Sequence, residues 1–150
     1  KRDPRVRYVA ILDQLCEQGR LGRKTGSGYY AYVDGKQTKT TDAHVRAIIS
    51  AASAQRGITR RRLEATEIQR RAVLAMVNEA ALLLREGVAQ RASDIDVVLV
   101  QGYGFPRAQG GPVFWARQQN RAELERDMDA LALASGHGFV RADLSALLSS

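Results

Sequence analysis

Hydrophobic residues recur every three or four positions along most of the chain, which is the spacing of helices that bury one face. The longest such segment is residues 66–87, where one stripe holds Val73, Val77, Ala80, Ala81 and Leu84. Shorter segments with this spacing predict helices over residues 4–19, 42–57, 94–101, 112–119, 121–135 and 142–150. Strands do not alternate with these helices, as a parallel sheet would require. The pattern therefore predicts an all-α fold with six or seven helices.

The ends of these helices are predicted from residues that satisfy free backbone groups or leave the helical conformation. Candidate N-caps are Asp42 with Thr41, Thr66 in a capping box with Gln69, Ser93, and Asn120 with Glu123. Pro112 suits a first helical turn. Asp94 and Asp96 place negative charge after Ser93, where a helix dipole favours it, so we expect "DIDVVLVQ" to be a short helix.

The segment "LGRKTGSGYYAY" at residues 21–32 departs from the helical pattern. It places Gly26, Gly28 and Ala31 in the spacing G-x-G-x-x-A, a permissive form of the dinucleotide-binding fingerprint. That fingerprint works between a strand and a helix, whose N-terminus binds the pyrophosphate. Here a predicted helix precedes the glycines, and an extended segment at 29–33 follows them before an Asp34-Gly35 turn. The order argues against a nucleotide site and predicts a tight turn beside half of a small hairpin.

Composition changes this picture mainly through charge. The 150 residues carry a net charge of +7, which suggests a polyanionic partner such as nucleic acid, an anionic membrane surface or a phosphate-bearing cofactor. Acidic residues interrupt the densest basic cluster, "TRRRLEATEIQRR", so a solvated helix face is the competing interpretation. No apolar run approaches the roughly 20 residues that span a bilayer. Cys16 is the only cysteine, which excludes an intrachain disulfide; we expect a reducing compartment and a buried Cys16.

Residue patterns that carry catalysis or metal binding are missing from the sequence. His44 and His137 are far apart, and neither has a metal-binding neighbour at helical spacing. The chain contains no G-x-S-x-G, phosphate-binding loop, C-x-x-C or H-E-x-x-H. We therefore expect no catalytic, cofactor-binding or metal-binding residue in this chain.

Two stretches resemble a known family. "LGRKTGSGYYAY" resembles the K-T-G-x-G-F-Y segment in the helical C-terminal domain of L-3-hydroxyacyl-CoA dehydrogenases. Residues 77–116 resemble the last domain of multifunctional fatty-acid oxidation enzymes, which join enoyl-CoA hydratase and this dehydrogenase in one chain. The residues in register are Asn78-Glu79, Glu86-Gly87, Ser93-Asp94-Ile95-Asp96, Gly102-Tyr103-Gly104-Phe105-Pro106 and Gly110-Gly111-Pro112.

The resemblance implies that the chain holds parts of a duplicated helical unit. Residues 1–40 would be the end of a truncated first copy, 41–63 a linker helix, and 64–150 the second copy. "VRYVAILDQL" near the start and "VRADLSALL" near the end share the same apolar spacing, as a duplication would produce. The family's NAD-binding Rossmann domain and catalytic His–Glu pair would lie upstream. Arg70 stands where the first copy carries its substrate-positioning asparagine, so the second copy does not restore that residue.

The implied function is that of the C-terminal portion of an NAD-dependent L-3-hydroxyacyl-CoA dehydrogenase of fatty-acid β-oxidation. This portion would pack against its own upstream Rossmann and hydratase domains, mimic a dimer partner and help to shape the acyl-CoA cleft, without activity alone. NAD would bind only in the full-length enzyme, and a bacterial-like, cytoplasmic location is expected, with a homo-oligomer left open.

Five residues are candidates for these contacts. Arg23 and Lys24 would meet the CoA phosphates, and Tyr103, Phe105 and Trp115 would lie at the domain interface, although core packing also explains the aromatic residues. Two alternatives remain: a free-standing basic helical module that binds nucleic acid or a protein, and an independent acyl-CoA-binding or oligomerisation domain.

Overall fold

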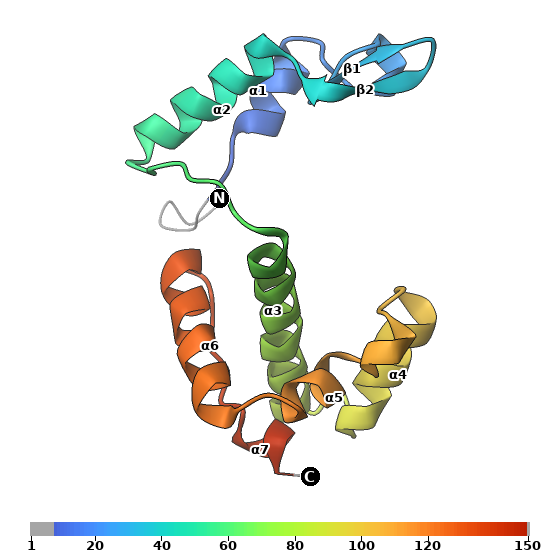
Figure 1. Ribbon diagram of the computed structural model, residues 1–150, viewed down its shortest axis with the longest axis vertical. Coiled ribbons are helices and arrows are strands. Elements are labelled where there is room, and N and C mark those ends of the chain that lie inside the picture. The colour runs from blue at the N-terminus through green and yellow to red at the C-terminus, as the bar shows by residue number, and fades with distance from the viewer. Residues whose placement is uncertain (1–7, 150) are drawn as a thin grey trace. The chain divides into compact units, whose positions relative to one another are not determined.

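The computed structural model describes residues 8–149, which divide into two compact units at residues 62 and 63 (Figure 1). The first unit contains α1 (Ile11–Glu17), η1 (Arg23–Thr25), β1 (Tyr30–Val33), β2 (Lys36–Thr41) and α2 (Ala43–Gln55). The second contains α3 (Ala65–Arg85), α4 (Ala92–Gly102), η2 (Arg107–Gln109), α5 (Pro112–Arg117), α6 (Arg121–Ser135) and α7 (Ser145–Leu148). Seven α-helices and one two-stranded sheet in this part of the chain confirm the expected mainly helical fold.

The glycine-rich segment of the first unit leads into a β-hairpin. β1 pairs antiparallel with β2 through the Asp34-Gly35 turn, in which both residues have positive φ, 49° and 72°. The extended segment predicted at 29–33 is therefore confirmed. Gly28 is buried, and a Cβ there would lie 2.9 Å from the Cα of Gly22, so only glycine allows these two backbone segments to approach. The G-x-G-x-x-A spacing thus serves a tight turn before a hairpin.

Helices α1 and α2 pack together in the first unit. Leu15 of α1 and Val45 of α2 are buried, whereas Cys16 is exposed, so the expectation of a buried Cys16 is wrong. The reason is helical geometry, because α1 turns the stripe through Ile11 and Leu15 inward and leaves its neighbour Leu12 58% exposed. Residue 4, the predicted start of this helix, lies outside the described residues.

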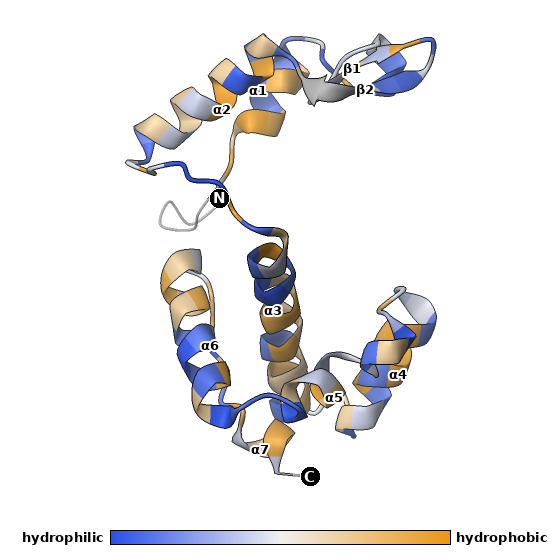
Figure 2. Ribbon diagram, viewed as in Figure 1, coloured by the Kyte–Doolittle hydropathy of each residue, from blue (hydrophilic) through white to orange (hydrophobic). Residues whose placement is uncertain are grey.

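The second unit is built around α3, which contacts α4, α5, α6 and α7. Figure 1 shows α6 and α4 on opposite sides of α3, and Figure 2 shows hydrophobic residues along both α3 and α4. The core joins residues from α3, α5, α6 and the C-terminal segment: Leu74, Val77, Ala81, Val113, Leu124, Met128, Leu144 and Leu147. Each is 5% exposed or less, so this unit has a hydrophobic core of its own.

Several of the predicted helix caps are right and two are wrong. Asp42 Oδ1 accepts the Val45 N–H at 2.8 Å, and Pro112 occupies the first turn of α5, as expected. The capping box at Thr66 is wrong: α3 begins at Ala65, because the Ile68 N–H bonds the Glu64 carbonyl. The predicted Glu123 partner does give its N–H to Asn120 at the start of α6.

The second wrong cap is Ser93, which lies inside α4. The helix begins at Ala92, two residues before the predicted start at 94, with Arg91 as its N-cap residue; the Arg91 guanidinium bonds the Asp94 carboxylate across the first turn. The last helix is also shorter than predicted. It begins at Ser145, whose N–H is accepted by the Asp143 carboxylate, while Ala142 bonds a distant side chain instead of continuing a helix.

Candidate domain-interface groove

An apolar groove runs between α3 and α4 in the second unit. It consists of two hollows of about 540 Å³ and about 400 Å³, which share Met76 and Leu99 as lining residues. We call this surface the α3–α4 groove. Its lining residues are Gln69, Ala72, Val73, Met76, Glu79, Ala80, Leu83, Val88, Ala89, Gln90, Asp94, Ile95, Val98, Leu99, Tyr103, Gly104, Phe105, Pro106 and Gln109.

Helix α3 produces this groove because it carries hydrophobic residues on two faces. One face holds Leu74 and Val77 and enters the core, while the other holds Val73, Met76 and Leu83 at helical spacing. This second face is only partly covered by α4. Met76 stays 42% exposed, and Val98 and Val88 stay 55% and 70% exposed. Apolar side chains gathered around a hollow in this way are typical of an interaction surface.

The loop after α4 closes one end of the groove. The Phe105 N–H bonds the Leu99 carbonyl at 3.0 Å, and Gly104 has a φ of 74° that turns the chain back toward α4. Phe105 is 9% exposed and Tyr103 is 79% exposed, and both line the same hollow. The structure therefore brings these two candidates together, with Phe105 part of the packing and Tyr103 available for contact.

Trp115, the third aromatic candidate, contacts a different group. The Arg70 guanidinium lies over its ring, 5.6 Å from the centroid. Arg70 also forms an ion pair with Asp127 of α6 and bonds Gln119 Oε1 at 3.2 Å. A side chain with these three partners ties α3 to α5 and α6, so Arg70 acts within the second unit.

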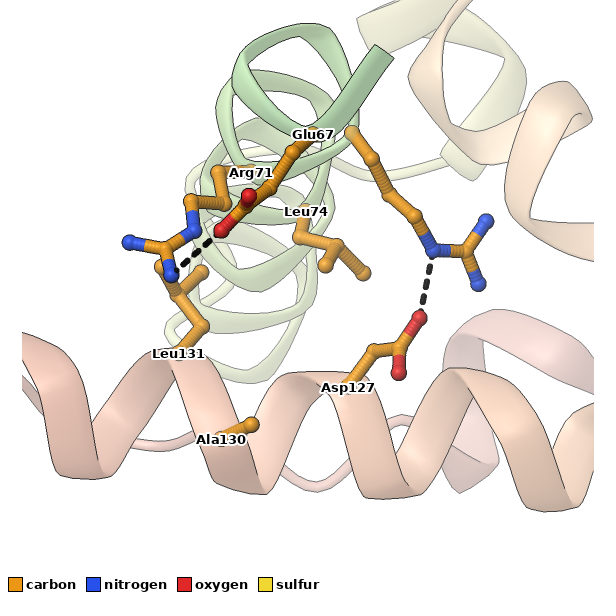
Figure 3. Close-up of a pocket in the computed structure, with 7 residues that line it drawn as sticks. Glu67, Arg71, Leu74, Asp127, Ala130 and Leu131 are labelled. Atoms are coloured by element: carbon orange, nitrogen blue, oxygen red, sulfur yellow. Dashed lines mark hydrogen bonds and ion pairs between the residues drawn. The ribbon is translucent and has the colours of Figure 1, made fainter. Parts of the chain in front are cut away.

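A smaller cavity of about 200 Å³ lies beside Arg70, between α3 and α6. Figure 3 shows Glu67 and Arg71 of α3 joined by an ion pair, which has an N–O distance of 2.8 Å, while Asp127 of α6 pairs with Arg70. Each cation that lines this cavity is thus paired with a carboxylate of the same unit. The arrangement suits helix packing better than the capture of a charged ligand.

Asp96 positions α5 in a way that the sequence interpretation missed. Its two carboxylate oxygens accept the N–H groups of Val113 and Phe114, at 2.8 and 3.0 Å. The sequence pattern places this charge at the start of α4, but the carboxylate accepts the N–H groups at the start of α5. The pair of glycines before Pro112 was the available signal, because a Cβ on Gly111 would lie 2.3 Å from Asp96 Oδ1.

The motif Asn78-Glu79 places two polar side chains in different environments. Asn78 is 3% exposed; its Nδ2 donates to the Val140 carbonyl and its Oδ1 accepts the Ala142 N–H, both at 2.9 Å. Asn78 therefore holds the segment between α6 and α7 against α3. Glu79, in contrast, is exposed and lines the α3–α4 groove.

Arg23 and Lys24 lie in η1 of the first unit, and both are exposed. The Arg23 guanidinium stands 5.9 Å from the centroid of the Tyr32 ring. Nearby, Arg20 bonds the Gly28 carbonyl at 2.9 Å and forms an ion pair with Asp42. The N–H of the α2 first turn, and then the Arg20 guanidinium, hold the pKa of Asp42 below its ordinary value of 3.8.

Histidines and acidic residues do not gather into a metal site in the described part of the chain, where no group of three His, Cys, Asp or Glu residues is placed to hold an ion. His44 Nε2 instead lies 2.6 Å from Gln18 Oε1. Among residues 8–149, no helix has both the length and the hydrophobicity needed to cross a membrane.

Comparison with known proteins gives a consistent set of relatives, although no family model matches the chain. The peroxisomal bifunctional enzyme of Danio rerio is 36% identical over 126 residues, or 83% of this chain and 17% of that protein. The Homo sapiens enzyme of the same name is 41% identical over 112 residues, 73% of this chain and 15% of that protein. A fatty acid oxidation complex subunit alpha from Vibrio campbellii is 33% identical over 133 residues, 89% of this chain and 18% of that protein.

The chain thus spans less than a fifth of the length of the curated relatives it matches. These relatives are bifunctional or multifunctional proteins of fatty-acid oxidation, and the mainly helical fold fits the C-terminal domain of such enzymes. The chain belongs to the family of multifunctional fatty-acid β-oxidation enzymes and matches a short helical part of them.

Proposed function

We propose that this chain is the C-terminal portion of an NAD-dependent L-3-hydroxyacyl-CoA dehydrogenase of fatty-acid β-oxidation, and that it supplies a packing surface for the catalytic part. The α3–α4 groove is the observation that carries this proposal. Its apolar lining leaves Met76, Val88 and Val98 substantially exposed, which is unfavourable in water and favourable against another domain.

Two polar side chains of the second unit, Arg70 and Asn78, support the same role. Arg70 and Asn78 are both occupied by contacts inside the unit, so neither is available to a substrate without losing those contacts. In the family resemblance, the second helical copy takes the place of a partner subunit's helical domain. The groove would then be buried against a neighbouring domain, and the unit would help to shape the cleft where the NAD and acyl-CoA domains meet in the complete enzyme.

Cofactor and partners follow from this role. NAD would be held by an upstream Rossmann domain, and the partners would be that domain, a hydratase domain and acyl-CoA. A cytoplasmic location, a homo-oligomer and contact of Arg23 and Lys24 with CoA phosphates stay predictions. The relatives' names include both peroxisomal proteins and a bacterial complex subunit.

Activity assays on two proteins test the proposal. The complete protein that contains this segment is expected to reduce NAD when it is given an L-3-hydroxyacyl-CoA, as followed by NADH absorbance. The 150-residue chain alone is expected to give no NADH and no NAD binding by calorimetry. Turnover by the isolated chain, or a complete protein without hydroxyacyl-CoA oxidation, would contradict the proposal.

A further inference from the structure

We propose that the α3–α4 groove receives a helix that carries a lysine or arginine, and that this cation pairs with Glu79. The occupant is a helix of another domain of the same enzyme, so the inference rests on the proposed function and specifies its interface. In the Asn78-Glu79 motif, Asn78 makes the contacts inside the unit. Those contacts do not involve Glu79, so they leave its role unexplained.

Glu79 is an unused charge at the edge of an apolar surface. Among residues 8–149 its carboxylate forms no hydrogen bond or ion pair, although the chain carries 23 lysines and arginines. The other carboxylate of the groove is Asp94, which Arg91 neutralises with an Nη2–Oδ1 distance of 2.8 Å. The hydrogen bond and charge of Asp94 raise the pKa of Arg91, as expected for a formed pair. Glu79 therefore sets the charge of the groove.

The groove itself contains no basic lining residue. An incoming cation would find one lining carboxylate, that of Glu79, that is not already paired with an arginine. A CoA ester is polyanionic, so Glu79 would repel its phosphates, and the acyl chain alone would leave the carboxylate unpaired. Charge complementarity thus favours a basic protein segment over the substrate.

The shape of the groove favours a helix as that segment. Its α3 wall runs from Gln69 to Leu83, with lining residues at helical spacing. Fourteen residue steps correspond to about 21 Å, or about four helical turns. An amphipathic helix lies in such a groove through apolar side chains one turn apart, and a cation at the edge of its apolar stripe would reach Glu79.

Photo-crosslinking in the complete protein tests this pairing. A benzophenone amino acid at Val98 probes the groove, and the same group at Leu133, which is 86% exposed on α6 and outside the lining, is the control. Gln90, another lining residue, repeats the test if the first position lowers expression. The expected adduct joins the groove to a helix of another domain that has a lysine or arginine within one turn of the crosslinked residue.

Charge reversal then tests Glu79 itself. Glu79→Lys is expected to reduce the Val98 crosslink at least tenfold, and replacing the captured cation by glutamate should restore it. Glu86→Lys makes the same charge change at an exposed residue outside the groove lining and should leave the crosslink unchanged. Equal losses in the two variants would overturn the role of Glu79.

Other adducts would also overturn the inference. These are a second copy of the chain, a photoreactive acyl-CoA captured in place of a helix, or no yield above the Leu133 control. If the complete protein oxidises hydroxyacyl-CoA but the groove captures no helix, the inference fails while the proposed function stands. If the groove captures the helix but no oxidation occurs, the proposed function fails.

Discussion

Asn78 shows how a single side chain holds two distant segments of this protein. Its amide satisfies a carbonyl and an N–H that lie 62 and 64 residues away, at the turn toward α7. Asp96 does the same for the start of α5, 17 and 18 residues on. Buried polar groups are costly when left unpaired, so such bridges fix the path of loops that have little apolar surface.

Replacing Asn78 by alanine removes both bonds and leaves the Val140 carbonyl and the Ala142 N–H without their partner. We expect a loss of about 2 kcal/mol in the free energy of unfolding of the second unit. Urea unfolding followed by the fluorescence of Trp115, the only tryptophan, measures this unit selectively. Gln90→Ala removes an exposed amide and should change stability by less than about 0.5 kcal/mol. Equal effects would show that the two bonds contribute nothing.

Gly111 and Gly102 differ in whether the structure has room for a side chain, so the same substitution can be compared at both positions. Gly111 has a φ of 112°, and a Cβ there would collide with Asp96, so Gly111→Ala should cost about 2 kcal/mol or more. A Cβ at Gly102 meets nothing within 4 Å, and the residue closes α4 without positive φ. Gly102→Ala should be neutral or slightly stabilising by the same urea assay. A stable Gly111→Ala protein would contradict the role given to the Asp96 contact.

At the scale of elements, the interior of each helix could be predicted from the sequence, but some ends could not. The stripe that includes Val77 and Ala81 is buried as expected, because helical spacing alone determines which residues share a face. Asp42, Pro112 and Asn120 act locally, and their roles were predicted correctly. The start of α3 depends instead on a backbone bond from the Ile68 N–H to the Glu64 carbonyl, and the start of α4 lies beside the Arg91–Asp94 pair. A capping pattern in the sequence contains neither.

Asp42 should make the first turn of α2 sensitive to acid. Because its pKa in the folded chain is lowered, the stability that its charge contributes is present above the ordinary value of 3.8 and is lost as pH falls below it through the lowered pKa. The protection of the Val45 amide against hydrogen exchange, measured by NMR, should follow this course. Asp42→Asn keeps a capping oxygen and should remove the acid dependence. Asp34→Asn, in the hairpin turn, should retain it.

Arg70 and Arg71 are consecutive, but Arg70 contacts three residues of other elements, whereas Arg71 forms an ion pair within its own helix. Arg70→Ala removes an ion pair, a hydrogen bond to Gln119 and the contact with Trp115, and should cost about 1 kcal/mol. It should also shift the Trp115 emission. Arg71→Ala removes one exposed pair with Glu67 and should cost less than about 0.5 kcal/mol. An unchanged emission spectrum in Arg70→Ala would contradict the cation–π contact.

At the scale of the whole molecule, the two units differ in charge. Residues 8–62 hold ten lysines and arginines against four acidic residues, whereas residues 63–150 hold nine against eleven. The basic excess that suggested a polyanionic partner is therefore absent from the second unit, which contains the apolar groove. Nucleic-acid binding is not favoured by the names of the relatives, which concern fatty-acid oxidation.

The family could be predicted from sequence because glycines and prolines at fixed spacing define loops that few other proteins share. The groove could not be predicted, because it depends on how far α4 covers the second apolar face of α3. The candidate aromatic residues illustrate the limit. Tyr103 and Phe105 lie at the groove, but Trp115 lies against Arg70, since the direction of a side chain is set by tertiary packing.

The exposure of Cys16 has a practical consequence for handling this protein. A lone accessible thiol cannot close a bond within its own chain, but it can join two chains when oxygen is present. Samples kept without reductant are therefore expected to accumulate a covalent pair, visible on a non-reducing gel. Cys16→Ser would abolish that band, so any association that persists in the variant is genuine.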